Sequence, residues 1–360
     1  MASPKITTVD KLHTYLYAAM QLEHATIPPY LTALYSIHPG TNLDAVQVIR
    51  VVVVEEMLHL TLAANILNAV GGTPDLTRPD FVPTYPSFLP DGETDFQVNR
   101  QGFREACLET FLKIERPGEA PSEERRLLPR ERSEGMLLAA VPDESGMRFY
   151  SIGEFYEEIG RGLAHLHEEK AKQGENLFAG DPALQVLPEY YYSGGGEVIP
   201  VTDLDSARAA IRVIAEQGEG KTHDVYDEQG ELAHYYRFQQ LQKGRYYQRG
   251  DEPDNPTGPP LTVDWKAAYP IKTNVSIDDY PDGSELRAAG VEFNEAYADL
   301  LTLLTRAYTG HPALLLDAVP EMFRLRDKMN RLIRNPVPGA HGVNAGPTFE
   351  VAKVPGKVGS

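Results

Sequence analysis

The sequence contains one short pattern of metal-binding side chains twice. Glu56 and His59 lie three residues apart in "EEMLH", and Glu231 and His234 have the same Glu-x-x-His spacing in "ELAH". On a helix this spacing places a carboxylate and an imidazole on one face, one turn apart, where both could bind the same metal ion. One such pair is weak evidence, because glutamate and histidine are common on helix surfaces.

The first pair lies in strongly apolar sequence, "VVVVEEMLHL". An ionised glutamate buried there without a partner would cost several kcal/mol, so it should be protonated, paired with a cation or bound to metal. Crowded carboxylates with raised pKa values are the competing explanation. His59 could equally be a hydrogen-bonded core histidine. Glu55 could be solvated, or could support a ligand without touching the metal.

Two further glutamates complete an ordered pattern. Glu23 lies in "QLEHATIP", and Glu154 or Glu158 lies in "SIGEFYEE", between the two Glu-x-x-His pairs. The same chain order occurs in ferritin-like four-helix bundles, whose inward-facing carboxylates and histidines hold two metal ions. Four carboxylates would balance two divalent ions, and ligands of mixed oxygen and nitrogen suit iron or manganese. If the apolar residues of this stretch mark the buried face of a helix, Glu158 lies nearer that face than Glu154.

Helices would position these side chains. Apolar residues recur at helical spacing, which predicts helices over 9–37 (interrupted by two prolines), 44–70, 101–115, 151–172, 203–220 and 230–245, and two more within 284–334. The charged run that follows residue 115 predicts an exposed loop within a long crossover. The expected fold is all-α: a ferritin-like four-helix bundle over 1–250, with insertions at about 73–150 and 173–203. Residues 251–360 would form a C-terminal helical extension packed on the bundle.

Several motifs together resemble a known family. They include "QLEHATIPPYL", "VVEEMLHLTLAANILNAVGGTP", "YPSFLP", "SIGEFYEEI", "QGEG" and "ELAHYYRF", spread over most of residues 10 to 240. The chain resembles the ferritin-like family whose members include the ferritin-like region of iminophenyl-pyruvate dimer synthases, from bisindole pigment biosynthesis. The resemblance implies a non-heme dimetal carboxylate site with the ligands Glu23, Glu56, His59, Glu154, Glu231 and His234. It favours Glu154 over Glu158, because Glu154 belongs to the "IGEFY" signature.

The resemblance leaves some roles open. Glu219, in "QGEG", could be a ligand or could line the pocket. The chain is much shorter than the pigment enzymes, so their dimerising activity is not carried over, since a shared fold fixes a site and not a substrate.

Two functions from different classes fit this site. The first is an oxidase or oxygenase in specialised metabolism, with two iron ions (manganese is the alternative), O2 as co-substrate and a small aromatic or amino-acid-derived substrate. An electron donor is a further possible partner, and no catalytic residue beyond the metal ligands is predicted. The alternative is a non-catalytic or peroxide-handling protein that binds or stores iron or manganese. The long insertions favour the enzyme, because a minimal storage bundle does not need them.

Composition restricts the partners and the compartment. The 52 acidic and 34 basic residues give a net charge of -18, which opposes binding to nucleic acids and anionic membranes. The single cysteine, Cys107, excludes an internal disulfide framework and fits a reducing compartment. The chain start has no signal-peptide pattern, and no segment has the apolar length of a membrane span. We therefore expect a cytoplasmic monomer or small homo-oligomer.

Overall fold

The computed structural model describes residues 5–118, 149, 151–191, 194–220, 225–227 and 229–354. Within these residues the chain forms helices, joined by loops with isolated β-bridges, and no named strand. The predicted all-α class is confirmed. Most of the charged run after residue 115, which we expected to be an exposed loop, lies outside the described residues.

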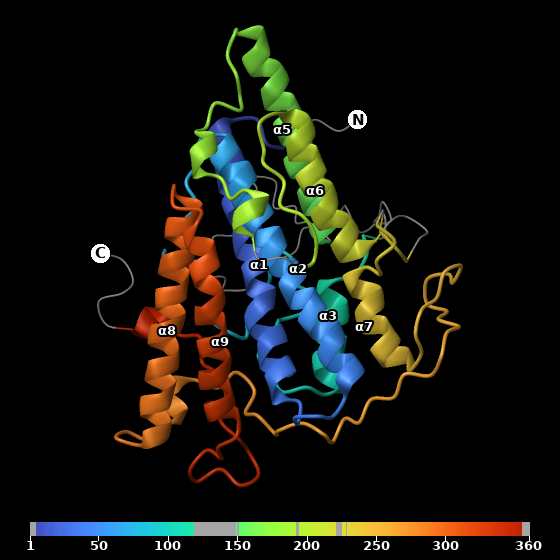
Figure 1. The fold of residues 1–360 in the computed structure, drawn as a ribbon, viewed down its shortest axis with the longest axis vertical. Coiled ribbons are helices and arrows are strands. Elements are labelled where there is room, and N and C mark those ends of the chain that lie inside the picture. Colours follow the sequence, from blue (N-terminus) through green and yellow to red (C-terminus); the bar gives the residue numbers. More distant parts are fainter. Residues whose placement is uncertain are drawn as a thin grey trace.

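Two long helices form the centre of the molecule. Helix α1 (Val9–Ser36) and helix α2 (Leu43–Ala69) lie side by side, and most of their residues are buried (Figure 1). Both are apolar on nearly every side, because other helices cover them on two faces. The side chain of Thr8 caps the start of α1 by accepting a hydrogen bond from the backbone N–H of Lys11. We call α1 and α2 the intact pair.

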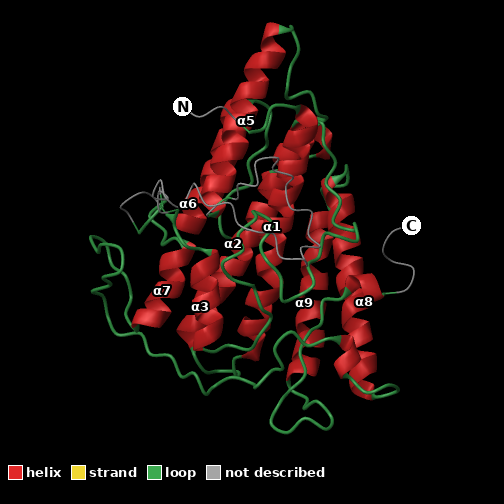
Figure 2. Ribbon diagram, turned by 180° about the vertical axis from the view of Figure 1, so that it is seen from behind, coloured by secondary structure: helices red, strands yellow, loops and turns green. Residues whose placement is uncertain are grey.

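Four shorter helices cover one side of the intact pair. They are α3 (Glu105–Ile114), α5 (Ile152–Lys172), α6 (Leu204–Glu219) and α7 (His234–Lys243). Helices α5 and α6 pack together towards one end of the bundle, and α3 and α7 pack together towards the other (Figures 1 and 2). The end of α3, the start of α5 and the end of α6 line one cavity, and α7 begins beside the end of α3. This half of the bundle therefore consists of two short helix pairs, α5 with α6 and α3 with α7, in place of one long pair. We call these four helices together the interrupted pair.

Helix α7 begins later than the predicted 230–245. Its first residue is His234, and Glu231 lies before it in a turn. Gly230 adopts a φ of 79°, in the left-handed region that favours glycine. The turn is closed by hydrogen bonds from the Asp227 N–H to the Glu231 carbonyl and from the Ala233 N–H to the Val225 carbonyl. Glu231 and His234 consequently do not share a helix face.

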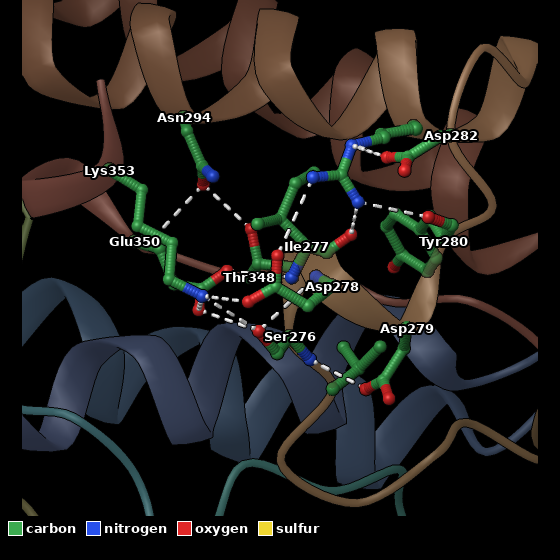
Figure 3. A network of polar contacts seen from close by, with 12 residues as sticks. Ser276, Ile277, Asp278, Asp279, Tyr280, Asp282, Asn294, Thr348, Glu350 and Lys353 are labelled. Atoms are coloured by element: carbon green, nitrogen blue, oxygen red, sulfur yellow. Dashed lines mark hydrogen bonds and ion pairs between the residues drawn. The ribbon is translucent and has the colours of Figure 1, made fainter. Parts of the chain in front are cut away.

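Helices α8 (Glu285–Tyr308) and α9 (Leu314–Ile333) cover the other side of the intact pair. Side chains from both parts of the chain contribute to one hydrophobic core. A polar network fastens the C-terminal tail to this extension (Figure 3): Glu350 accepts hydrogen bonds from the Ser276 hydroxyl and the Ile277 N–H, and Lys353 pairs with Asp278. The proposed division of the chain near residue 250 stays a prediction.

Two further expectations from the sequence concern the single cysteine and membrane spans. Cys107 is fully buried within α3, as a small packed residue. In the described part of the chain, no helix combines the length and the apolar character needed to cross a membrane.

Candidate metal centre

Five buried side chains meet where the interrupted pair is broken. They form two groups, Glu23 with Glu56 and His59, and Glu56 with Glu115 and His234. Within each group one ligand atom of every residue lies within 4.8 Å of the others, and Glu56 belongs to both groups. The intact pair supplies three of these residues from helix interiors, whereas the interrupted pair supplies Glu115 and His234 from helix ends.

The first group is built around His59. Its Nδ1 lies 3.3 Å from Oε2 of Glu23 and 3.7 Å from Oε1 of Glu56. Its Nε2 lies 2.9 Å from Oε1 of Gln217, whose own Nε2 donates to the Gly195 carbonyl at 2.6 Å. That second bond fixes the amide with its oxygen towards the histidine, so Nε2 of His59 is the donor. Nδ1 therefore faces the carboxylates, and its lone pair becomes available to a metal ion when the proton that it shares with them is lost.

The second group repeats this geometry around His234. Its Nε2 lies 2.8 Å from Oε2 of Glu55, and an ionised carboxylate can only accept, so Nε2 carries the proton. Its Nδ1 lies 3.0 Å from Oε1 of Glu56 and 3.4 Å from Oε2 of Glu115. This buried Nδ1 makes no hydrogen bond of normal geometry within the described residues. The two imidazole rings stack with their centroids 5.5 Å apart.

A buried hydroxyl group supports each of the three carboxylates. Tyr156 donates to Glu23 at 2.6 Å, Thr26 donates to Glu56 at 2.7 Å, and Tyr30 donates to Glu115. Burial and the adjacent carboxylates raise the pKa of both tyrosines well above the ordinary value, so both remain protonated at neutral pH. These hydroxyls fix the orientation of the carboxylates from outside the cluster.

The cluster has an excess of buried negative charge. Burial and the neighbouring charge of Glu115 raise the pKa of Glu56 from 4.5 to about 7. Burial by itself would lower the pKa of both histidines, but Glu23 raises that of His59 and Glu115 raises that of His234. In the metal-free cluster, Glu56, His59 and His234 therefore retain protons more strongly than usual, which offsets part of the negative charge. Divalent metal ions could replace these protons, and the donor set of carboxylate oxygens and Nδ1 lone pairs fits such ions.

A cavity lies beside this cluster. It is lined by Glu23, Glu56, His59, Glu115, Ile152, Ile214, Ala215, Gly218 and Glu219. The carboxylate of Glu219 accepts hydrogen bonds from the backbone N–H groups of Gly153, at 2.6 Å, and Gly118, at 3.0 Å. Burial raises the pKa of this carboxyl group. Glu219 therefore lines the cavity and joins the ends of three segments of the interrupted pair.

Three glutamates expected as ligands or alternatives lie outside both groups. Glu231 is exposed to 66% and pairs with Arg237 at 3.0 Å, because it precedes α7 instead of belonging to it. Glu158 is buried but accepts hydrogen bonds from the Arg161 side chain and the Lys5 backbone N–H. Glu154 lies partly buried in the first turn of α5 and is absent from both groups. The expected set with Glu154 and Glu231 is not assembled.

Sequence reasoning missed Glu115 and the supporting role of Gln217. Glu115 follows the last residue of α3 and has no histidine partner at a helical spacing. Its only sequence signal is its place at the end of an amphipathic stretch, directly before "RPG". Glu55, whose role the sequence left open, supports His234.

Comparisons with known proteins agree with this fold. The model of the family described as Ferritin-like matches residues 16–243. A dichlorochromopyrrolate synthase from Lentzea aerocolonigenes is 29% identical over 324 residues, which are 84% of this chain and 29% of that protein. The chain thus spans less than a third of the length of this relative. The crystal structure of a ferritin-like protein from Caulobacter vibrioides matches with a TM-score of 0.58 and 23% identity, over 90% of this chain and 95% of the other.

Proposed function

This chain belongs to the ferritin-like family, and we propose that its buried cluster holds two transition-metal ions and serves an O2-using oxidase or oxygenase. The observation that carries the proposal is the shared carboxylate. Glu56 belongs to both groups of possible ligands, and each group contains one histidine whose Nδ1 faces the carboxylates. A site of this kind suits a pair of ions better than a single one.

Each ion would have its own set of residues. Glu23, Glu56 and His59 would hold one ion, and Glu56, Glu115 and His234 would hold the other. Mixed carboxylate and imidazole ligands favour iron, with manganese as the alternative. Iron bound there would supply the electron exchange with O2 that amino-acid side chains do not perform. An oxidase takes its electrons from the organic substrate, whereas a monooxygenase needs two further electrons from a separate donor.

The residues around the cluster would orient its ligands and limit the access of water. The hydroxyl groups of Tyr156, Thr26 and Tyr30 orient the three carboxylates. Ile152, Ile214 and Ala215 give the cavity an apolar wall, which would limit the access of water to the cluster. Glu219 adds a carboxyl group at that wall, held in place by the backbone N–H groups of Gly153 and Gly118.

The similarity to a dichlorochromopyrrolate synthase supports a small organic substrate in biosynthesis. Because the chain matches only 29% of that relative, the activity of the relative is not assigned to it. We propose an aromatic or amino-acid-derived substrate.

The test is O2 uptake by protein loaded with Fe(II) without oxygen. Aromatic amino acids and their 2-oxo and imino acids are supplied as substrates, and products are followed by mass spectrometry. We expect one compound to accelerate O2 uptake and to be converted, and His234→Ala to abolish both effects. Iron that stays Fe(II) in air contradicts the oxidase. So does the accumulation of many Fe(III) ions per chain with no compound converted, which would favour the storage alternative.

A further inference from the structure

We propose that Glu55 and Gln217 make the two metal positions unequal, so that the position at His234 binds its ion more tightly than the position at His59. This inference rests on the proposed dimetal site. It assigns positioning roles to two residues that are outside both groups of possible ligands.

The two histidines differ in the group that their outward-facing nitrogen contacts. Both direct Nδ1 to the carboxylates and Nε2 away from them. Nε2 of His59 donates to a neutral amide, that of Gln217, whereas Nε2 of His234 donates to a carboxylate, that of Glu55. The two positions are otherwise matched, with one further carboxylate each and Glu56 in common.

Glu55 is held firmly in place. It is buried on α2, and Nη2 of Arg237 lies 3.7 Å from its second oxygen. Gly195 packs so closely that a Cβ atom there would lie 2.5 Å from Cγ of Glu55. Arg237 also pairs with Glu231, so this glutamate is connected to the cluster through Arg237, Glu55 and His234.

Gln217 is held by two hydrogen bonds. Its amide spans His59 and the carbonyl of Gly195, so the glycine segment that packs on Glu55 also fixes Gln217. Both supports thus depend on one piece of backbone, but only Glu55 carries a charge. The two supports therefore differ in charge.

A carboxylate acceptor strengthens the histidine as a ligand. Hydrogen bonds with an ionised partner are about twice as strong as neutral ones. Such an acceptor also raises the basicity of the imidazole, and loss of a supporting partner typically costs about 10–100-fold in metal affinity. We therefore expect the ion at His234 to bind at least about tenfold more tightly than the ion at His59.

The experiment isolates each position with one histidine variant and uses Co(II), followed by visible absorbance, as the probe. His59→Ala should retain the ion at His234, and His234→Ala should retain the ion at His59. We expect the first variant to bind its ion at least about tenfold more tightly. Adding Glu55→Gln, which keeps the shape and the acceptor oxygen but removes the charge, should weaken the first variant about tenfold and leave the second unchanged.

Gln217→Leu provides the matched control, because it should weaken only the ion retained by His234→Ala. Equal affinities at the two positions, or a Glu55→Gln effect of the same size in both backgrounds, overturns the inference and leaves the dimetal site intact. If the unmodified chain binds fewer than two Co(II) ions, the proposed function itself fails.

Discussion

The intact and interrupted pairs solve the same problem differently. Helices α1 and α2 present Glu23, Glu56 and His59 from continuous helix interiors, where backbone hydrogen bonds on both sides fix each position. The interrupted pair presents Glu115 and His234 at helix ends, beside the cavity. The two halves therefore have different roles: the continuous half presents three of the candidate ligands from within helices, and the broken half presents the other two and lines much of the cavity beside them.

The shared carboxylate should show the largest effect. Glu56→Ala removes a ligand from both groups, so we expect the metal content after Fe(II) loading to fall from about two ions per chain to nearly none. Glu115→Ala removes a ligand only from the group at the interrupted pair and should leave about one ion per chain. Elemental analysis of desalted protein measures both. Equal losses in the two variants would contradict the assignment of Glu56 to both groups.

The pH dependence of stability should reverse on metal loading. Glu56, His59 and His234 all have pKa values raised in the folded, metal-free chain, so this state binds more protons than the unfolded chain. Its stability should consequently fall as pH rises from about 4.5, the ordinary pKa of Glu56, through about 7, its raised value, and should fall further as the two histidines lose their protons. Metal binding displaces the same protons, so the stabilisation by metal should grow over that range. Thermal melts with Co(II) and with a chelator measure the difference, and a gain from metal that shrinks with rising pH would contradict the cluster.

The contact between Gly153 and Glu219 in the interrupted pair should not tolerate a larger side chain at position 153. A Cβ atom on Gly153 would lie 2.6 Å from a carboxylate oxygen of Glu219, so Gly153→Ala should destabilise the protein by about 1–3 kcal/mol. Gly160 is the control, because it lies in the same helix with its nearest neighbour at 3.9 Å. Gly160→Ala should be neutral or stabilise by up to about 1 kcal/mol. Urea unfolding compares the two, and similar stabilities would show that the Glu219 junction is loose.

The smallest effects should come from glutamates outside both groups. Glu154→Gln and Glu231→Gln should each leave about two ions per chain, because neither carboxylate belongs to a group of possible ligands. Elemental analysis again provides the measurement. Loss of a whole ion from either variant would restore that residue as a ligand and would mean that the interrupted pair rearranges when metal binds.

The half of the site on the intact pair could be predicted from the sequence. Glu23, Glu56 and His59 lie within long apolar helices, where periodicity fixes which side chains share a face. The all-α class and the ferritin-like fold followed from the same periodicity and from the order of the motifs, and the structure and the family match confirm them.

The interrupted half of the site was harder to predict from the sequence, because helical spacing shows which side chains share a face only within a continuous helix. The Glu-x-x-His pattern at Glu231 suggested a shared face, but the turn at Gly230 delays the helix until His234. Glu115 is brought into the cluster by the packing of α3 against α7, which no local pattern encodes. Gly230 was the available warning, since a glycine that adopts positive φ commonly ends or delays a helix.

The most direct test of the dimetal centre is an anomalous difference map, recorded at the iron absorption edge from crystals loaded with Fe(II) without oxygen. We predict two peaks on either side of Glu56, one beside Glu23 and His59 and the other beside Glu115 and His234. A single peak, or peaks beside Glu154 or Glu231 in place of Glu115, would contradict the account.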